Sequence, residues 1–352
     1  MGTLATPLLV AVFLAAAAAT WVAGVLLSKS TDALDARFGL GEELGGILLL
    51  AVAGSLPELA ITVSAASGGH LDLAAGNLIG GIAMQTMVLV ICDIAAGRER
   101  PLTFLVGALT PVVEALLVVL VVSGVLMGAL LRSSVAIGGV VSPASIAIVV
   151  VWVVGVYVIN SARKEQRWTV SMPGSHPGRR HRRERHPDRP HPFASSTTAR
   201  VAGLFALACG VTLVAGVALE TTGNTLADRA GVNGVVFGAT VLAIATALPE
   251  ISSGIAAVAL GDNALALGDI FGGNAFQVCL FLIADIVAGK PVLPTAGRLN
   301  SWLASLGVAL TAIYAIGVIA RPDRARWRLG PDSILAILVF AIGIAGLFAL
   351  SH

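Results

Sequence analysis

Charged residues are scarce in this sequence. Asp, Glu, Lys and Arg make up 12% of its 352 residues, whereas 57% are hydrophobic, and the mean hydropathy is +0.91. Soluble globular domains contain about 25% charged residues. The composition therefore excludes an ordinary soluble protein and indicates a polytopic membrane protein, whose main partner is the lipid bilayer.

Three further absences narrow the function classes. The three cysteines are odd in number and fall inside apolar runs, so a disulfide framework is not expected. No Lys or Arg precedes the first apolar run, so a signal peptide is disfavoured and a retained helix is expected. All six histidines lie in loops or at the terminus, and no catalytic spacing is recognisable in the apolar runs. We therefore expect no enzymatic activity, no cofactor and no nucleic-acid partner.

Ten apolar runs are long enough to cross about 30 Å of hydrocarbon, which requires roughly 20 helical residues. They are continuous rather than alternating polar and apolar residues, which excludes a β-barrel. The predicted fold is an all-α membrane protein with ten transmembrane helices. The runs cover residues 7–27, 44–67, 71–95, 103–126, 134–160, 200–220, 233–260, 264–288, 299–320 and 332–350.

One segment of the chain occurs twice. Residues 46–97 and 238–289 are identical at 21 of 52 positions when the chain is shifted by 192 residues. The copies keep their glycines and polar residues while their aliphatic residues differ, which indicates that a site constrains them. Internal repeats of this kind are typical of secondary transporters.

The positive charges predict the topology. With the N-terminus outside, the outer side keeps only four of the 22 Lys and Arg residues, namely Arg132, Arg229, Lys290 and Arg298. This bias predicts that both termini lie outside the cell membrane and that the central loop is cytoplasmic. Since five spans separate equivalent points, the two copies enter the membrane from opposite sides, and the predicted repeat is inverted.

The predicted organisation is two five-helix halves, residues 1–160 and 200–352, joined by residues 161–199. This joining segment is basic and rich in proline, which predicts a disordered linker. Histidines recur in it every five residues, at His176, His181, His186 and His191. We favour a linker over a metal site, because a proline-broken tract has no fixed geometry and its arginines repel cations. Those arginines are expected to contact anionic lipid, at about 1 kcal/mol each.

Two glutamates occupy equivalent places within the apolar runs. Glu58 follows Pro57, and Glu250 follows Pro249. A carboxylate at mid-membrane depth costs at least roughly 2.5 to 3.5 kcal/mol, so a matched pair indicates function rather than two protonated packing residues. Proline interrupts a helix and frees carbonyl oxygens, which are tolerated at this depth where they line a cavity. Hard cations prefer such oxygen ligands, so we predict a cation site.

Hydroxyl, amide and carboxylate side chains near the two glutamates complete the predicted site. In the span that follows each glutamate, polar residues recur at i and i+8 with a glycine between them, and so share one helix face. The glycines are interpreted as packing residues. A glutamine in each copy offers an amide oxygen without adding charge. The candidate ligands beyond the glutamates are Ser55, Thr246, Asn77, Gln85, Asp269 and Gln277.

Three other acidic residues lie within the spans. Asp93 and Asp285 are rotated off the ligand face and lie near span ends, so an interfacial or structural role is favoured. Glu114 has no counterpart in the second half. It is either a partner in a helix–helix hydrogen bond or an accessory proton site.

These motifs resemble those of the calcium/cation antiporter superfamily, the sodium/calcium exchangers and their prokaryotic relatives. The resemblance rests on GSLPE (54–58) and TALPE (246–250), and on GNLIGGI (76–82) and GDIFGGN (268–274). It covers nearly the whole chain. It implies that Glu58 and Glu250 are the central calcium ligands, between the second, third, seventh and eighth helices.

The chain departs from the family pattern in its hydroxyl residues. Gly54 and Ala247 replace a threonine and a serine beside the glutamates, and Gly81 and Gly273 replace serines in the following helices. Gln85 and Gln277 stand where exchangers have Asn or Asp. The hydroxyl shell credited with sodium binding is therefore thinned, whereas the acidic pair for a divalent ion remains.

The function expected is antiport of calcium by alternating access. Two carboxylates neutralise one divalent ion, so the unloaded site requires a replacement charge before it crosses. Sodium is the family's usual counter-ion, and protonation of the glutamates is the alternative. A cation channel is less favoured, because the polar residues cluster at mid-depth rather than forming a continuous stripe. A receptor or scaffold that does not transport would not need both acids.

Overall fold

The computed structural model describes residues 4–38, 52–96, 100–165, 193 and 195–351. Over these residues the chain is helical, and its β-structure is limited to two isolated bridges. The helices of the first half are α1 (Thr6–Phe38), α3 (Leu56–Gly68), α4 (Leu71–Ala96), α5 (Leu102–Leu105), α6 (Thr110–Ala129) and α7 (Pro143–Glu165). Those of the second half are α8 (Thr198–Ala230), α9 (Gly234–Phe237), the π-helical turn η3 (Gly238–Leu242), α10 (Ala243–Thr246), α11 (Leu248–Ala259), α12 (Asn263–Gln277), α13 (Leu280–Ala288), α14 (Gly297–Ala320) and α15 (Pro331–Ser351).

The prediction of an all-α membrane protein is confirmed. Within the described ranges, eight spans are long and apolar enough to cross a membrane, and the bent pair α9–α10 and α11 makes a ninth if it is counted as one. The span expected over 44–67 begins among residues outside the described ranges, so the count of ten stays a prediction. The basic run and its four histidines also lie outside the described residues.

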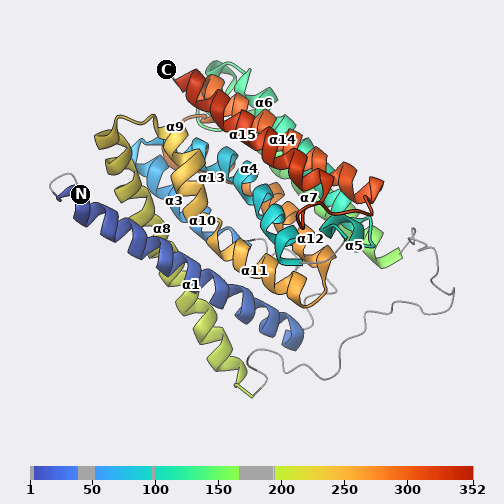
Figure 1. Ribbon diagram of the computed structural model, residues 1–352. Coiled ribbons are helices and arrows are strands. Elements are labelled where there is room, and N and C mark those ends of the chain that lie inside the picture. The colour runs from blue at the N-terminus through green and yellow to red at the C-terminus, as the bar shows by residue number, and fades with distance from the viewer. Residues whose placement is uncertain (1–3, 39–51, 97–99, 166–192, 194, 352) are drawn as a thin grey trace, which may run out of the picture.

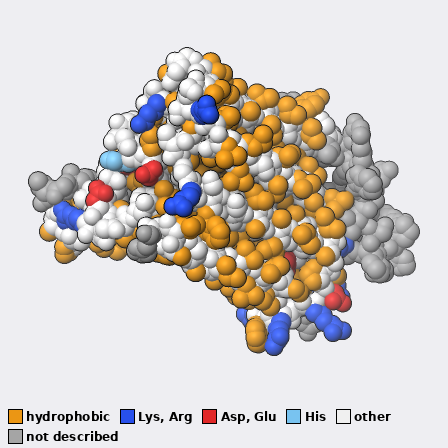
Figure 2. Space-filling view, turned by 90° about the horizontal axis from the view of Figure 1, so that it is seen from above, with side chains coloured by type: hydrophobic (Ala, Val, Ile, Leu, Met, Phe, Trp, Pro, Cys, Tyr) orange, Lys and Arg blue, Asp and Glu red, His pale blue; other side chains and the backbone are white. Residues whose placement is uncertain are grey.

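The helices form two groups on either side of α4 (Figure 1). α1 and α8 pack together on one side, while α6, α7, α14 and α15 pack on the other. In the most apolar 18-residue stretch of α4, 72% of the residues are buried, whereas 22% are buried in the corresponding stretch of α15. α4 is therefore central in the bundle and α15 is peripheral. Figure 2 shows a face dominated by hydrophobic side chains, with charged side chains gathered toward its edges, as a lipid-facing surface requires.

α1 and α8 are antiparallel and bound to each other at both ends. The Arg37 guanidinium donates to the Thr198 hydroxyl at 3.1 Å, and the Arg229 guanidinium donates to the Thr6 hydroxyl at 2.9 Å. Each arginine is therefore bonded to the first residue of the other helix. The two helices both contain 33 residues and begin 192 positions apart, so these contacts are reciprocal. We refer below to the Arg37 end and the Arg229 end of the bundle.

A second reciprocal arrangement fixes the starts of α7 and α15. Asp285 accepts hydrogen bonds from the backbone N–H groups of Ser142 and Val292 and from the Ser145 hydroxyl, at 2.7–2.9 Å. Asp93, its counterpart 192 residues earlier, accepts three equivalent bonds of 2.7 Å. Its donors are the N–H groups of Leu102 and Gly330 and the hydroxyl of Ser333. The structural role favoured for these two aspartates is therefore what the structure shows.

Replacing Asp285 by alanine is expected to destabilise the fold by about 3 kcal/mol, because it leaves three buried donors without an acceptor. For a chain of 352 residues this corresponds to a fall in Tm of about 4 °C, measured by thermal unfolding in detergent. Asp228→Ala is the matched control, because Asp228 is exposed and should change stability by less than about 0.5 kcal/mol. Equal Tm values for the two variants would contradict the structural role of Asp285.

Candidate functional site

The two Pro-Glu pairs lie where helices are interrupted. Pro57 is in the first turn of α3, and Pro249 is in the first turn of α11. Proline supplies no N–H to the carbonyl four residues earlier, so the carbonyls of Ala53 and Ala245 lose that helical donor. The second-half span bends by 45° at this point, directly after the π-helical turn η3. Both interruptions therefore lie directly beside a glutamate, Glu58 in α3 and Glu250 in α11.

Glu58 is held in the protein interior by groups from two other helices. It is 1% exposed, and Gln85 of α4 donates its amide hydrogen to Glu58 Oε1 at 3.2 Å. The Thr246 side chain at the end of α10 lies near the same carboxylate, while its hydroxyl donates to the carbonyl of Ala243 at 3.3 Å. Glu58 Oε2 is buried and lacks a hydrogen-bond partner among the described residues. The structure therefore brings together Glu58, Gln85 and Thr246 and leaves one carboxylate oxygen available.

Glu250 lies close to two further carboxylates. It interacts electrostatically with Glu58 of α3 and with Asp269 of α12. Its Oε2 is also buried and has no hydrogen-bond partner among the described residues. Like charges at short range in a low-dielectric interior repel by several kcal/mol, so this group of acids requires protons or a bound cation.

A cavity of about 50 Å³ borders Glu250 on the side facing the Arg37 end. α1 contributes Ser28 and Thr31 to its wall, and α11 contributes Ser253. The Ser253 hydroxyl donates to Asp269 Oδ2 at 2.8 Å. The full lining is Gly24, Leu27, Ser28, Thr31, Ala53, Gly54, Pro57, Pro249, Glu250, Ser253 and Asp269. The cavity has room for a cation and a few waters, and the polar residues of its mixed wall carry the kind of oxygen ligand that hard cations prefer.

The residues that bring hydroxyls to this cavity were not predicted from the sequence. Ser253 carried a usable signal, because it lies three residues after Glu250 and therefore on the same helix face. Ser28 and Thr31 carried none, since they lie in an apolar run 222 and 219 residues before Glu250. Only the packing of α1 against α11 brings them to the site.

Of the eight predicted ligands, Glu250 and Asp269 line this cavity, and three of the others, Ser55, Asn77 and Gln277, make no hydrogen bond to either glutamate side chain among the described residues. The Gln277 amide donates to the backbone carbonyls of Asn77 and Leu78, at 3.3 and 3.0 Å, rather than to a glutamate. Asn77 is fully buried, and both its amide atoms lack partners among the described residues. Ser55 is buried at the start of α3, and its side chain does not cap that helix.

The glycines between the polar positions do not pack alike. Gly81 of α4 lies directly against the Gln277 amide, so a side chain there would displace that amide. Its counterpart Gly273 has open space around it. The packing role expected for these glycines therefore holds for the first copy only.

A carboxylate cluster of the kind that holds a transition metal is absent from the described part of the chain. No three His, Cys, Asp or Glu side chains there are placed to bind one ion together. A cation at this site would instead combine the two glutamates with amide, hydroxyl and carbonyl oxygens. Calcium takes six to eight such ligands in flexible geometry.

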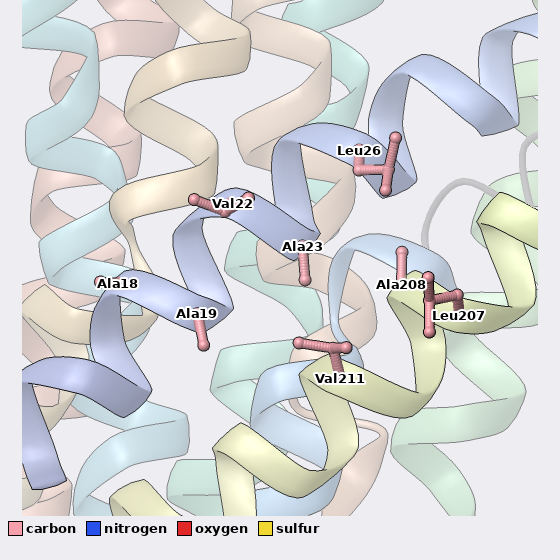
Figure 3. A pocket seen from close by; sticks show the side chains of 8 residues that line it. All are labelled: Ala18, Ala19, Val22, Ala23, Leu26, Leu207, Ala208 and Val211. Atoms are coloured by element: carbon pink, nitrogen blue, oxygen red, sulfur yellow. The ribbon is translucent and has the colours of Figure 1, made fainter.

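The larger cavity of the bundle has a different character. It measures about 440 Å³ and lies between α1 and α8 (Figure 3). Eight aliphatic residues line it: Ala18, Ala19, Val22, Ala23, Leu26, Leu207, Ala208 and Val211. A wall of this kind offers no oxygen to replace the hydration shell of an ion, so this cavity is not the cation site.

Comparison with known proteins gives consistent matches. The family model "Sodium/calcium exchanger protein" matches residues 8–169 and 200–349. The inner membrane protein YrbG of Escherichia coli (strain K12) is 27% identical over 266 residues, covering 75% of this chain and 73% of YrbG. The H+/Ca2+ exchanger CAX has a similar fold, with a TM-score of 0.68, 16% identity and coverage of 97% of this chain and 86% of CAX. The sodium-calcium exchanger NCX_Mj superimposes with a TM-score of 0.61 at 15% identity, over 97% of this chain and 99% of NCX_Mj.

Gly24 of α1 is expected to be indispensable to the wall of the cation cavity. A Cβ there would lie 2.6 Å from two ring atoms of Pro249, which cannot rotate away. Gly24→Ala should push α1 off α11 and destabilise the protein by about 1–3 kcal/mol. Gly203→Ala is the control, because Gly203 has open space around it and alanine favours the helix by up to about 1 kcal/mol. Thermal unfolding of both variants should therefore shift in opposite directions, and a shift in the same direction would contradict this packing.

Proposed function

The chain belongs to the sodium/calcium exchanger protein family, a family of transporters rather than enzymes, and we propose that it exchanges calcium for sodium by alternating access. The observation that carries this proposal is the meeting of Glu58 and Glu250 at two proline-interrupted spans, each with a buried oxygen that has no partner among the described residues. Two carboxylates balance the charge of one divalent cation. The inner membrane is the proposed location, as the name of YrbG states for that relative.

Electrostatics makes the exchange obligatory. When calcium leaves, the negative charges of Glu58 and Asp269 both repel that of Glu250 inside the membrane. Charges left uncompensated in a buried site cost several kcal/mol. The site therefore changes orientation only with calcium or with a replacement positive charge bound.

The cavity favours sodium as that replacement charge. Ser28, Thr31 and Ser253, which carry hydroxyls, are among the residues that line the cavity beside Glu250. Their hydroxyl oxygens are hard ligands of the kind that sodium prefers. They compensate for the family's serines, which this chain replaces by glycine at positions 81 and 273. Protonation of Glu58 and Glu250 is the alternative, and the two structural neighbours, one an H+/Ca2+ and one a sodium-calcium exchanger, represent both modes of coupling.

The predicted ligands take unequal parts in this proposal. Glu58 and Glu250 bind the ion directly, and Thr246 and Gln85 assist at Glu58. Asp269 acts beside Glu250, and the Ser253 hydroxyl contacts both the Asp269 carboxylate and the backbone carbonyl of Glu250. Ser55, Asn77 and Gln277 are ligands of another stage of the cycle, in which their surroundings are repacked.

The proposed topology has ten transmembrane helices in two inverted halves, with both termini outside. The reciprocal bonds of Arg37 and Arg229 and the matched acceptors Asp93 and Asp285 support the repeat. The Arg37 end is then cytoplasmic, since α7 ends and α8 begins there beside the basic segment. That segment is proposed to rest on anionic lipid.

Calcium-45 uptake into proteoliposomes tests the function. Uptake should follow an outward sodium gradient and fall at least roughly 100-fold in Glu58→Gln and in Glu250→Gln, because each removes one of two charges that hold the ion. Asp228→Asn is the control, since this acid is exposed on α8, and its uptake should be unchanged. Uptake driven by a proton gradient alone would replace sodium by protons as the counter-ion. An absence of uptake under both gradients, in protein that remains folded, would overturn the calcium assignment.

A further inference from the structure

Glu220 of α8 is a buried carboxylate outside the cation site. It is 1% exposed, and its two oxygens contact groups of the first half. The Ser64 hydroxyl of α3 donates to Oε2 at 2.7 Å, and His70 Nδ1 lies 2.7 Å from Oε1. His70 is in the turn between α3 and α4, and its side chain is 37% exposed. The three residues thus tie α8 to that turn, at the Arg229 end of the bundle.

The internal repeat relates Glu220 to a residue of α1 that borders the cation cavity. A shift of 192 residues relates Glu220 to Ser28, which lines the cation cavity at the Arg37 end. The helices make reciprocal contacts at this level. A Cβ on Gly24 would meet Pro249, and a Cβ on its counterpart Gly216 would meet the carbonyl of Pro57. The position of Glu220 relative to Glu58 therefore corresponds to that of Ser28 relative to Glu250.

The two ends of the bundle differ in one respect. At the Arg37 end, Ser253 and Asp269 border a cavity and are partly exposed. Their counterparts at the Arg229 end, Ile61 and Asn77, are completely buried. Equivalent positions thus border a cavity at the Arg37 end and are buried at the Arg229 end.

The closed end contains polar atoms that its packing does not satisfy. Both amide atoms of Asn77 and Oε2 of Glu58 are buried without partners among the described residues. Each such atom costs about 1–3 kcal/mol. Atoms of this kind are tolerated when another conformation hydrates them or pairs them with a ligand.

From this asymmetry we infer that the Arg229 end holds a second access cavity to Glu58, closed here by the hydrogen bonds of Ser64 and His70 to Glu220. When these bonds break, Glu220 and Asn77 line the open cavity, and Glu220 attracts the divalent cation that passes to Glu58. The inference rests on the proposed function for the identity of the cation. The closing contact itself follows from the geometry of Glu220, Ser64 and His70.

Cysteine accessibility tests the closing contact without any transport. In protein with Cys92, Cys209 and Cys279 replaced by alanine, a charged methanethiosulfonate reagent should modify Ser253→Cys rapidly and Ile61→Cys slowly. Adding Ser64→Ala with His70→Ala should increase the rate at residue 61 at least about tenfold and decrease the rate at residue 253. The matched control is Ser67→Ala, because that exposed hydroxyl bonds only within its own helix, to the carbonyl of Val63.

A second variant keeps the test decisive if the double variant does not fold. Glu220→Gln preserves the size of the side chain and removes its charge, and should still raise the labelling rate at residue 61 about threefold. Unchanged labelling at residue 61 in folded Glu220→Gln and in the folded double variant would overturn the closing contact.

Calcium-45 exchange by the same proteins separates this inference from the proposed function. Glu220→Gln should raise the calcium concentration for half-maximal exchange at least about threefold, while Ser67→Ala leaves it unchanged. Altered labelling in protein that does not transport calcium would support the closing contact and overturn the proposed function. Calcium exchange with unaltered labelling would do the reverse.

Discussion

The structure depends on the cost of keeping Glu58 and Glu250 within electrostatic range of each other in an apolar bundle. Each carboxylate has an oxygen without a hydrogen-bond partner among the described residues, and the two repel each other. In a membrane interior this arrangement is unfavourable unless a cation is shared between the acids. The proline interruptions, the Gln85 amide and the cavity beside Glu250 all lie next to this pair of acids.

Reciprocal contacts hold the two halves around the acidic pair. Arginine–hydroxyl bonds join α1 and α8 at both ends, and a buried aspartate in each half fixes the start of a peripheral helix. These contacts are nearly equal in the two halves. The surroundings of the two glutamates are not, since a cavity borders Glu250 while the corresponding positions near Glu58 are buried. A symmetric scaffold that holds an asymmetric site has two equivalent arrangements, and this is the physical basis of alternating access.

The sequence predicted most of the scaffold but fewer of the ligands. The apolar runs predicted spans that begin close to the starts of α1 and α8, and the place of Asp93 and Asp285 near span ends predicted their structural role. Gln277 was expected to face the ion, but its amide bonds to the carbonyls of α4. Helical periodicity places a residue on a face, and it does not say which neighbour that face meets. For the same reason, Ser28 and Thr31 could not be assigned to the site before α1 was packed.

The sequence alone therefore determined the membrane class, the all-helical fold and the two acids. Each depends on composition or on local spacing, which hydrophobic burial and proline chemistry convert directly into structure. Only the tertiary structure decided which hydroxyl residues lie near Glu250, which glutamine donates a hydrogen bond to Glu58, and which end of the bundle is closed. The first and last of these outcomes depend on contacts between helices more than 150 residues apart, such as Ser64 with Glu220, and the second on how α3 packs against α4. A pattern in the chain places a residue on one face of its own helix, and it does not specify which distant helix that face meets.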